Sequence, residues 1–433
     1  MPDLEQPTTR GGQRPTEKSQ RGLDWFAFFL ADVQVGFGPF LSIYLTTEKW
    51  TNTDIGLVLS AGAILGLVGQ VPGGALIDAL RRDKLIATIA MIAIGISALW
   101  IGLSPQFLSV MLAQMLHVGA SVIVGPALAA ISLGLAGHAL IGERLGRNAR
   151  FAACGSIAAG VFMGLIGKTI SSQAVFYVTA TMAIPAVIAV LSISSEEIKR
   201  GHRCDVPREH YALLPALRDL LRQRALVVLA ACVFFFHLSN AAVLPIVAST
   251  ITMRVGEEAT LMIAAAMIVP QVMVALASPH IGRFADRHGR RKLLLIGFAA
   301  LPVRAILLAS TTDPFALVAI QLLDGISATC LGVLVATSVA DIVRTSGNFN
   351  LALGVVGSAM GVGAAISTTL AGYLADGYGS SATLLTLSVL GLCGFLLFAL
   401  LMPETKKSIP SEANAGCDET KQPDTEPHLG RIV

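Results

Sequence analysis

Long apolar runs, separated by short polar connections, fill most of the chain. Twelve of these runs reach about 19 residues or more, close to the roughly 20 helical residues that cross the hydrocarbon core of a bilayer. Backbone groups in lipid must pair within their own segment, so such runs predict helices rather than barrel strands. The pattern therefore predicts an all-α membrane protein. The expected transmembrane helices lie at about 23–47, 53–78, 84–103, 106–135, 148–169, 174–194, 224–249, 257–282, 292–310, 314–342, 348–375 and 380–402.

The longest internal connection divides the twelve runs into six and six. Gln114 and Gln321 match at an offset of 207 residues, and Asp78 and Asp286 at 208, which indicates two six-helix pseudo-symmetric halves. Part of the connection, Leu213–Arg224, reads as a short amphipathic surface helix. The predicted organisation is a disordered cytoplasmic tail (1–22), the N-terminal half (23–194), the cytoplasmic middle loop (195–222), the C-terminal half (223–402) and a second cytoplasmic tail (403–433).

Composition and charge agree with a membrane location. Of the 433 residues, 54% are apolar and only 14% are charged, whereas a soluble protein carries roughly 25% charged residues. If the N-terminus is cytoplasmic, 27 of the 31 Lys and Arg residues fall on the tails and the cytoplasmic connections. Because cytoplasmic loops carry the excess of Lys and Arg, we expect both termini in the cytoplasm and the chain in a bacterial inner (plasma) membrane.

Several classes of chemistry find no support in the sequence. The six cysteines show neither disulfide-framework nor zinc-site spacing. The chain has no GxxxxGK[ST] phosphate loop, which argues against ATP-driven transport. No nucleophile–base constellation appears either. We therefore expect no enzyme, no metal and no cofactor, and as partners the lipid bilayer and a small-molecule substrate rather than nucleic acid.

One polar stretch stands out, Gly282–Lys292, which places five cationic side chains and one carboxylate between two apolar runs. A fainter copy, Gly74–Lys84, repeats the order of Gly, Asp and basic residues. Each stretch is either a positively charged loop that only orients the chain or part of a cytoplasmic gate. The candidate gate-loop residues are Gly74, Asp78, Arg81, Arg82, Gly282, Asp286, Arg287, Gly289 and Arg290.

Twelve spans in two halves, a long middle loop and G-x-x-x-D-R-x-G-R-[RK] between spans 8 and 9 resemble the major facilitator superfamily (MFS). The resemblance covers about residues 23–402. It implies that spans 1, 4, 7 and 10 line a central cavity, and that the loop aspartate and arginines hold the inward side closed. The first copy departs from the family pattern at Ala79 and Arg81. Either that copy closes less tightly, or the second-half loop carries more of the role.

Ionisable residues fall near the middle of four of these spans. Asp32, His117, His237 and Asp324 lie roughly 13–20 Å deep at 1.5 Å per helical residue. A charge at that depth costs about 2.5–3.5 kcal/mol, so such residues are usually interior and functional. Asp32 is the leading candidate for proton coupling, with a structural ion pair as the alternative. Asp324 is a second proton or cation site, Gln34 a cavity residue, and the two histidines either cavity or packing residues.

Two further features belong to this set. Arg304, in span 9, either snorkels outward or pairs with Asp324 or another carboxylate, and a structural role is slightly favoured. The segment Gly36-Phe-Gly-Pro39 is expected to loosen the first helix.

These observations favour a monomeric secondary transporter that exports a small organic compound, a drug or a metabolite, in exchange for protons. Gly155–Gly167 is glycine-rich but lacks the proline usual in drug antiporters of the superfamily, which weakens a drug-efflux assignment. One alternative is a proton-coupled importer of a metabolite or siderophore-like solute. An alternative of another class is a membrane sensor that does not transport.

Overall fold

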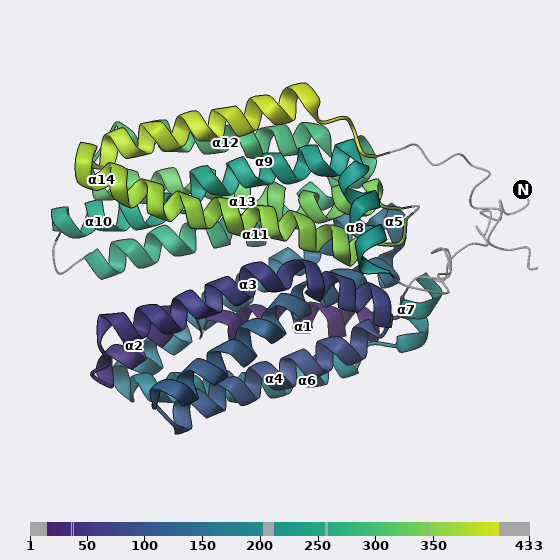
Figure 1. Cartoon of the computed structure of the whole chain (residues 1–433), viewed down its shortest axis with the longest axis horizontal. Coiled ribbons are helices and arrows are strands. Elements are labelled where there is room, and N and C mark those ends of the chain that lie inside the picture. Colours follow the sequence, from purple (N-terminus) through teal and green to yellow (C-terminus); the bar gives the residue numbers. More distant parts are fainter. Residues whose placement is uncertain are drawn as a thin grey trace, which may run out of the picture. The chain divides into compact units, whose positions relative to one another are not determined.

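The computed structural model describes residues 15–35, 37, 39–201, 212–255, 259–344 and 346–406. Within these ranges all regular secondary structure longer than a turn is helical (Figure 1). The helices are α1 Glu17–Val35, α2 Pro39–Thr47, α3 Asn52–Leu80, α4 Asp83–Leu103, α5 Phe107–Thr169, α6 Ser172–Leu191, α7 Ser195–Gly201, α8 Leu213–Arg222, α9 Arg224–Asn240, α10 Val243–Val255, α11 Ala259–His288, α12 Arg291–Ala309, α13 Pro314–Ile342 and α14 Phe349–Leu401.

The predicted count of twelve spans is confirmed once two long helices are divided. Ten segments in the described part of the chain are long and apolar enough to cross a membrane. Two of them, α5 and α14, have 63 and 53 residues, far more than one crossing needs. Each bends at a glycine in the left-handed region, Gly137 (φ 64°) and Gly379 (φ 81°), where a side chain would be strained. Each therefore supplies two spans.

Two helix boundaries differ from the predicted tails. Residues 17–22 were expected in a disordered tail, yet α1 begins at Glu17, because Thr16 Oγ1 accepts the Ser19 backbone N–H at 3.3 Å and Arg21 pairs with Glu17 at 3.1 Å. Residues 403–406 are also placed, packed at the turn between α11 and α12. The rest of both predicted tails, 1–14 and 407–433, lies outside the described residues.

Two groups of helices are visible in Figure 1, the first half (α1–α6, purple to blue) and the second half (α9–α14, teal to yellow). The halves pack together through α5 against α11 and α3 against α14. In the connection between them, α7 and α8 are helical, so the short helix expected near Leu213 is confirmed, while 202–211 lie outside the described residues. The first helix is broken as expected, since α1 ends at Val35 and α2 begins at Pro39; Gly36 and Gly38 themselves are not described.

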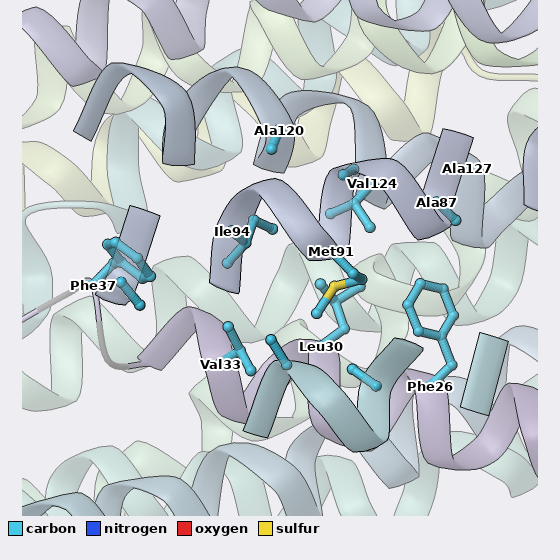
Figure 2. Packing of buried hydrophobic residues seen from close by; sticks show 14 of the residues in the cluster. Phe26, Leu30, Val33, Phe37, Ala87, Met91, Ile94, Ala120, Val124 and Ala127 are labelled. Atoms are coloured by element: carbon cyan, nitrogen blue, oxygen red, sulfur yellow. The ribbon is translucent and has the colours of Figure 1, made fainter. Parts of the chain in front are cut away.

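Side-chain packing fixes α1 within the first half. Phe26, Leu30 and Val33 follow helical i, i+4, i+7 spacing and are buried. Figure 2 shows them turned toward Met91 and Ile94 of α4. Because lipid tails are as apolar as these side chains, close packing rather than the hydrophobic effect holds such helices together. This packing positions the carboxylates that α1 also carries.

The predicted gate loops are mostly helix ends. Gly282–His288 belongs to α11, and only Gly289 and Arg290 lie between α11 and α12. Gly74–Leu80 likewise belongs to α3, with Arg81 and Arg82 before α4. Each helix continues until a residue takes a left-handed conformation, Arg81 (φ 49°) or Gly289 (φ 101°). Both α3 and α11 terminate at the same end of the bundle. We refer to this end as the motif end.

Candidate functional site

At the motif end, Asp286 of the second half binds the first half. Its Oδ1 accepts the backbone N–H of Gly142 at 3.1 Å, and its Oδ2 accepts that of Glu143 at 2.6 Å. These N–H groups lie in the early turns of the part of α5 that follows the Gly137 bend. The start of a helix attracts negative charge. The carboxylate therefore binds close to the start of the opposing helical segment.

Asp78 makes the pseudo-symmetry-equivalent contact, in which a carboxylate of the first half binds a helix of the second half. Its Oδ1 accepts from Asn350 Nδ2 at 2.7 Å and from the Asn350 backbone N–H at 3.2 Å, and its Oδ2 accepts the Leu351 N–H at 2.8 Å. Both donors lie in the first turn of α14. The two predicted gate aspartates thus bind backbone N–H groups near the starts of two helical segments across the boundary between the halves.

The two motif glycines, each one turn before its aspartate, allow this close approach. A Cβ added at Gly74 would lie 2.0 Å from the Asn350 carbonyl oxygen, and one at Gly282 would lie 2.0 Å from the Gly142 carbonyl oxygen. Backbone at that distance leaves no room for a side chain. Farther along α5, Ser278 Oγ donates to the Gly146 carbonyl at 2.8 Å and Arg150 Nε to the Ala275 carbonyl at 2.9 Å. The halves are closed against each other over this length.

The Asp286 contact is reinforced by a buried guanidinium. Arg290, 2% exposed, donates from Nη1 to Asp286 Oδ1 at 2.8 Å and from Nε to Asp341 Oδ2 at 3.0 Å. Asp341 lies near the end of α13. The arginine therefore ties α11, α13 and, through Asp286, α5 into one network.

Residues after the last helix clamp the same turn. Glu404 accepts the backbone N–H groups of Arg290 and Arg291 at 2.9 and 3.1 Å. Lys406 Nζ donates to the carbonyl oxygens of Asp286 and Arg287, the last of which lies 2.9 Å away. Partial burial raises the pKa of Glu404, but the hydrogen bonds from backbone N–H groups outweigh it, so the pKa lies below its usual value.

The other basic gate residues are exposed. The side chains of Arg82 and Arg287 are exposed, and Arg287 contributes its carbonyl oxygen instead. Arg81 is exposed too. Arg81, Arg82, Lys84 and Arg344 line a cavity of about 690 Å³ next to Asp78, between the two halves.

Asp32 lies on α1, 7% exposed, and its Oδ2 is buried with no hydrogen-bond partner among the described residues. Such an oxygen is costly to leave unsatisfied, so Asp32 is a candidate for binding a proton or a ligand. Gln34, two residues on, is exposed.

His117 of α5 is buried and stacks on Phe37, the residue within the break between α1 and α2, with ring centroids 3.5 Å apart and planes 9° apart. Its Nε2 lies 3.5 Å from Ser121 Oγ. His237 of α9 is partly buried and its Nδ1 lies 3.0 Å from the Val233 carbonyl oxygen. That oxygen can only accept, so Nδ1 carries the proton. No hydrogen bond or ion pair in the described part joins Asp32, His117, His237 or Asp324 to one another.

Asp324 and Arg304 form an ion pair, which decides between the alternatives for Arg304. Arg304 Nη1 donates to Asp324 Oδ1 at 2.6 Å and to Asn240 Oδ1 at 2.6 Å, and Nη2 donates to Gln321 Oε1 at 2.5 Å. Arg304 is 2% exposed, so it does not snorkel. The pair joins α12, α13 and α9 and neutralises Asp324. Within the described ranges, Asp32 has no such cationic partner.

Sequence reasoning missed a buried carboxylate, Asp24 in α1. Its two oxygens bind the guanidinium groups of Arg144 and Arg147 of α5. The sequence did contain one signal, the two arginines three residues apart. They lie on the same face of a helix, and if that face is buried their charges need a carboxylate as partner. No group of three or more His, Cys, Asp or Glu side chains that would hold a metal occurs within the described ranges.

Two six-span halves, closed against each other at one end, with ionisable side chains inside the spans, are the architecture of a membrane carrier. The family model of the Major Facilitator Superfamily matches residues 25–273 and 229–422. The chain belongs to this superfamily of transporters. Two relatives, each described as an uncharacterized MFS-type transporter of Mycobacterium tuberculosis (strains CDC 1551 / Oshkosh and ATCC 25618 / H37Rv), are 35% identical over 393 residues, covering 90% of this chain and 94% of each relative.

Solved structures confirm the fold. The MFS proton:xylose symporter XylE bound to 6-bromo-6-deoxy-D-glucose matches with a TM-score of 0.68 at 13% identity, over 90% of this chain and 95% of its own. The MFS transporter FucP in the outward conformation also has a TM-score of 0.68, at 14% identity, over 90% of this chain and 99% of its own. At these identities the likeness shows the fold alone.

Proposed function

We propose that the protein exports a small organic compound in exchange for protons, by alternating access. The two halves rock about a site near the middle of the spans and expose it to one side at a time. Asp32 is the proton-coupling carboxylate, and Gln34, His117, His237 and Asp324 line or support the cavity. Asp78 and Asp286, with their glycines and Arg290, form the gate that must break before the motif end opens.

The observation that carries this proposal is the contrast between the two midspan carboxylates. Asp324 is paired with Arg304 at 2.6 Å, whereas one oxygen of Asp32 is buried without a hydrogen-bond partner among the residues that the structure describes. A carboxylate held away from water and cations takes up a proton more readily than a paired one. Asp32 is therefore the group best suited to exchange a proton in each cycle.

The distribution of Lys and Arg supports a cytoplasmic location for the motif end and both termini in a bacterial inner membrane. The state described here is then closed toward the cytoplasm. The chain would work as a monomer, because its two halves together supply the cavity and the gate.

The experiment that tests the proposal uses purified protein in proteoliposomes. Compounds are first screened for thermal stabilisation of the protein, and the flux of a stabilising compound is then driven by an imposed proton gradient. Asp32→Asn should abolish gradient-driven flux and leave membrane insertion intact. Asp54→Asn is the matched control, because it makes the same substitution at a carboxylate outside the proposed cavity. The Asp54 side chain instead binds Thr51 at the start of α3. Normal flux in Asp32→Asn would refute the assignment.

The direction of transport separates this proposal from an importer, the alternative favoured by the likeness in fold to a proton:xylose symporter. Inside-out vesicles with an acidic interior should accumulate the compound if the protein exchanges it for protons. Loss of the compound from such vesicles along with protons would instead identify a symporter. A sensor that does not transport would produce neither flux.

A further inference from the structure

A buried polar network links α1 to the gate inside the first half. Asp24, 2% exposed, accepts from Arg144 Nη2 at 2.5 Å and also from Arg147. Arg144 in turn donates to Asn148 Oδ1 at 3.0 and 2.6 Å, and Asn148 Nδ2 donates to Ser132 Oγ at 2.7 Å. The network joins α1 to the parts of α5 on both sides of the Gly137 bend.

The arginines of this network lie beside the contact made by Asp286. Arg144 directly follows Gly142 and Glu143, whose backbone N–H groups bind Asp286. When Asp24 fixes the Arg144 side chain, it fixes the orientation of that helical turn. Two N–H groups can bind one carboxylate only if the turn faces it.

Asp24 also provides the buried negative charge of the network. It faces two guanidinium groups, and the other carboxylate near Arg144, that of Glu143, is exposed. Without Asp24, the buried Arg144 would keep only the neutral Asn148 oxygen as a partner among the contacts described here. A buried charge that loses its partner is strongly unfavourable, so the turn would have to move.

The same helix carries Asp32. Eight residues separate Asp24 from Asp32, about 12 Å along a helix axis. Between them, α1 touches α5 at backbone distance, because a Cβ added at Gly155 would lie 2.2 Å from the Phe28 carbonyl oxygen. These contacts connect the position of α1 at Asp32 with the turn of α5 that binds Asp286.

We infer that Asp24 is a positioning residue, which holds the Gly142–Glu143 turn ready for Asp286 and couples the α1 site to closure of the motif end. The inference rests on the proposed alternating-access function. It assigns to the Asp24–Arg144–Arg147 cluster a role in gating in addition to packing.

The test follows opening of the motif end directly and needs no substrate. Spin labels are placed on full-length protein in lipid nanodiscs through Arg82→Cys and Arg344→Cys, exposed positions in the two halves. Distance distributions are then compared for Asp24→Asn, Asp24→Glu, Asp286→Asn and the double variant. The exposed Cys154 and Cys393, together with Cys204 and Cys417, are first replaced by serine.

We expect Asp24→Asn and Asp286→Asn each to raise the ratio of open to closed molecules by about tenfold, within the range of contact coupling energies. The double variant should open no further than Asp286→Asn alone, since both changes remove the same contact. Asp24→Glu, which keeps the charge, should restore most of the closed population.

Three outcomes separate the possibilities. An unchanged distribution in Asp286→Asn would overturn the proposed gate itself. Opening in Asp286→Asn but not in Asp24→Asn would leave the gate and overturn the role of Asp24. Strictly additive opening, or an Asp24→Asn protein that loses only thermal stability while remaining closed, would show that Asp24 packs α1 without acting on the gate. Arg147→Gln, at a half-exposed position, gives a milder second test if Asp24→Asn does not fold.

Discussion

The Asp78 and Asp286 contacts share one geometry but differ in chemistry. Each aspartate follows its glycine by one turn and accepts backbone N–H groups near the start of a helical segment of the other half. The three hydrogen bonds that Asp78 receives across the boundary come from the neutral donors of Asn350 and Leu351. Asp286 also receives the buried guanidinium of Arg290. The two contacts therefore share a backbone geometry, and we expect the charge network at Asp286 to make its contact the stronger one.

The difference traces to single positions in the repeat. Arg82 stands 208 residues before Arg290 but is exposed. Arg290 bridges to Asp341, and the residue 207 before Asp341 is Gly134, which offers no carboxylate. An arginine at the first copy has no second carboxylate at that position to compensate for the cost of burying its charge. The expectation that the first copy closes less tightly agrees with this asymmetry and remains a prediction.

The largest effect is expected from removing the buried arginine. Arg290→Gln should destabilise the protein by about 3 kcal/mol, because breaking one side of a buried ion pair typically costs roughly 3–5 kcal/mol and Asp341 remains 12% exposed. Arg82→Gln should change stability by less than about 0.5 kcal/mol, as at other surface sites. Thermal unfolding in detergent measures both. Equal losses would mean that the two copies are held alike.

The aspartates themselves should show a smaller difference. Asp286→Asn should weaken closure by about 1.4 kcal/mol, which corresponds to a tenfold rise in the ratio of open to closed molecules and is close to the roughly 1.5 kcal/mol that a weak hydrogen bond to a charged group contributes. Asp78→Asn should weaken it by about 1 kcal/mol, because Asn350 retains an amide partner. Transport kinetics should show slower turnover with little change in substrate binding. Gly56→Ala, at a position with open space around the added Cβ, serves as the control. A larger defect in Asp78→Asn would reverse the assignment.

Much of this arrangement was predictable from local sequence. Twelve apolar runs and the repeated motif predicted the two halves, because span length and loop charge are local properties. Partners distant in sequence were not predictable. Asp24 and Arg144 are 120 residues apart, and Asp24 read as an ordinary charge at the start of a span. For Arg304 the sequence named Asp324 as one possible partner, but only packing of α12 against α13 excludes the lipid-facing alternative.

The smallest predicted effect concerns Glu404, which binds the turn between α11 and α12, and this effect depends on pH. Glu404 has a pKa below its usual value in the folded protein. Its contribution to stability is therefore present above the pKa of the unfolded chain and is lost as pH falls through the lower, folded value. Glu404→Gln should lower stability at neutral pH by less than about 1 kcal/mol, because the carboxylate is exposed and screened. Unfolding of both proteins across an acid titration should show the gap closing at low pH. A gap that stays constant with pH would mean that the Glu404 side chain contributes through packing rather than charge.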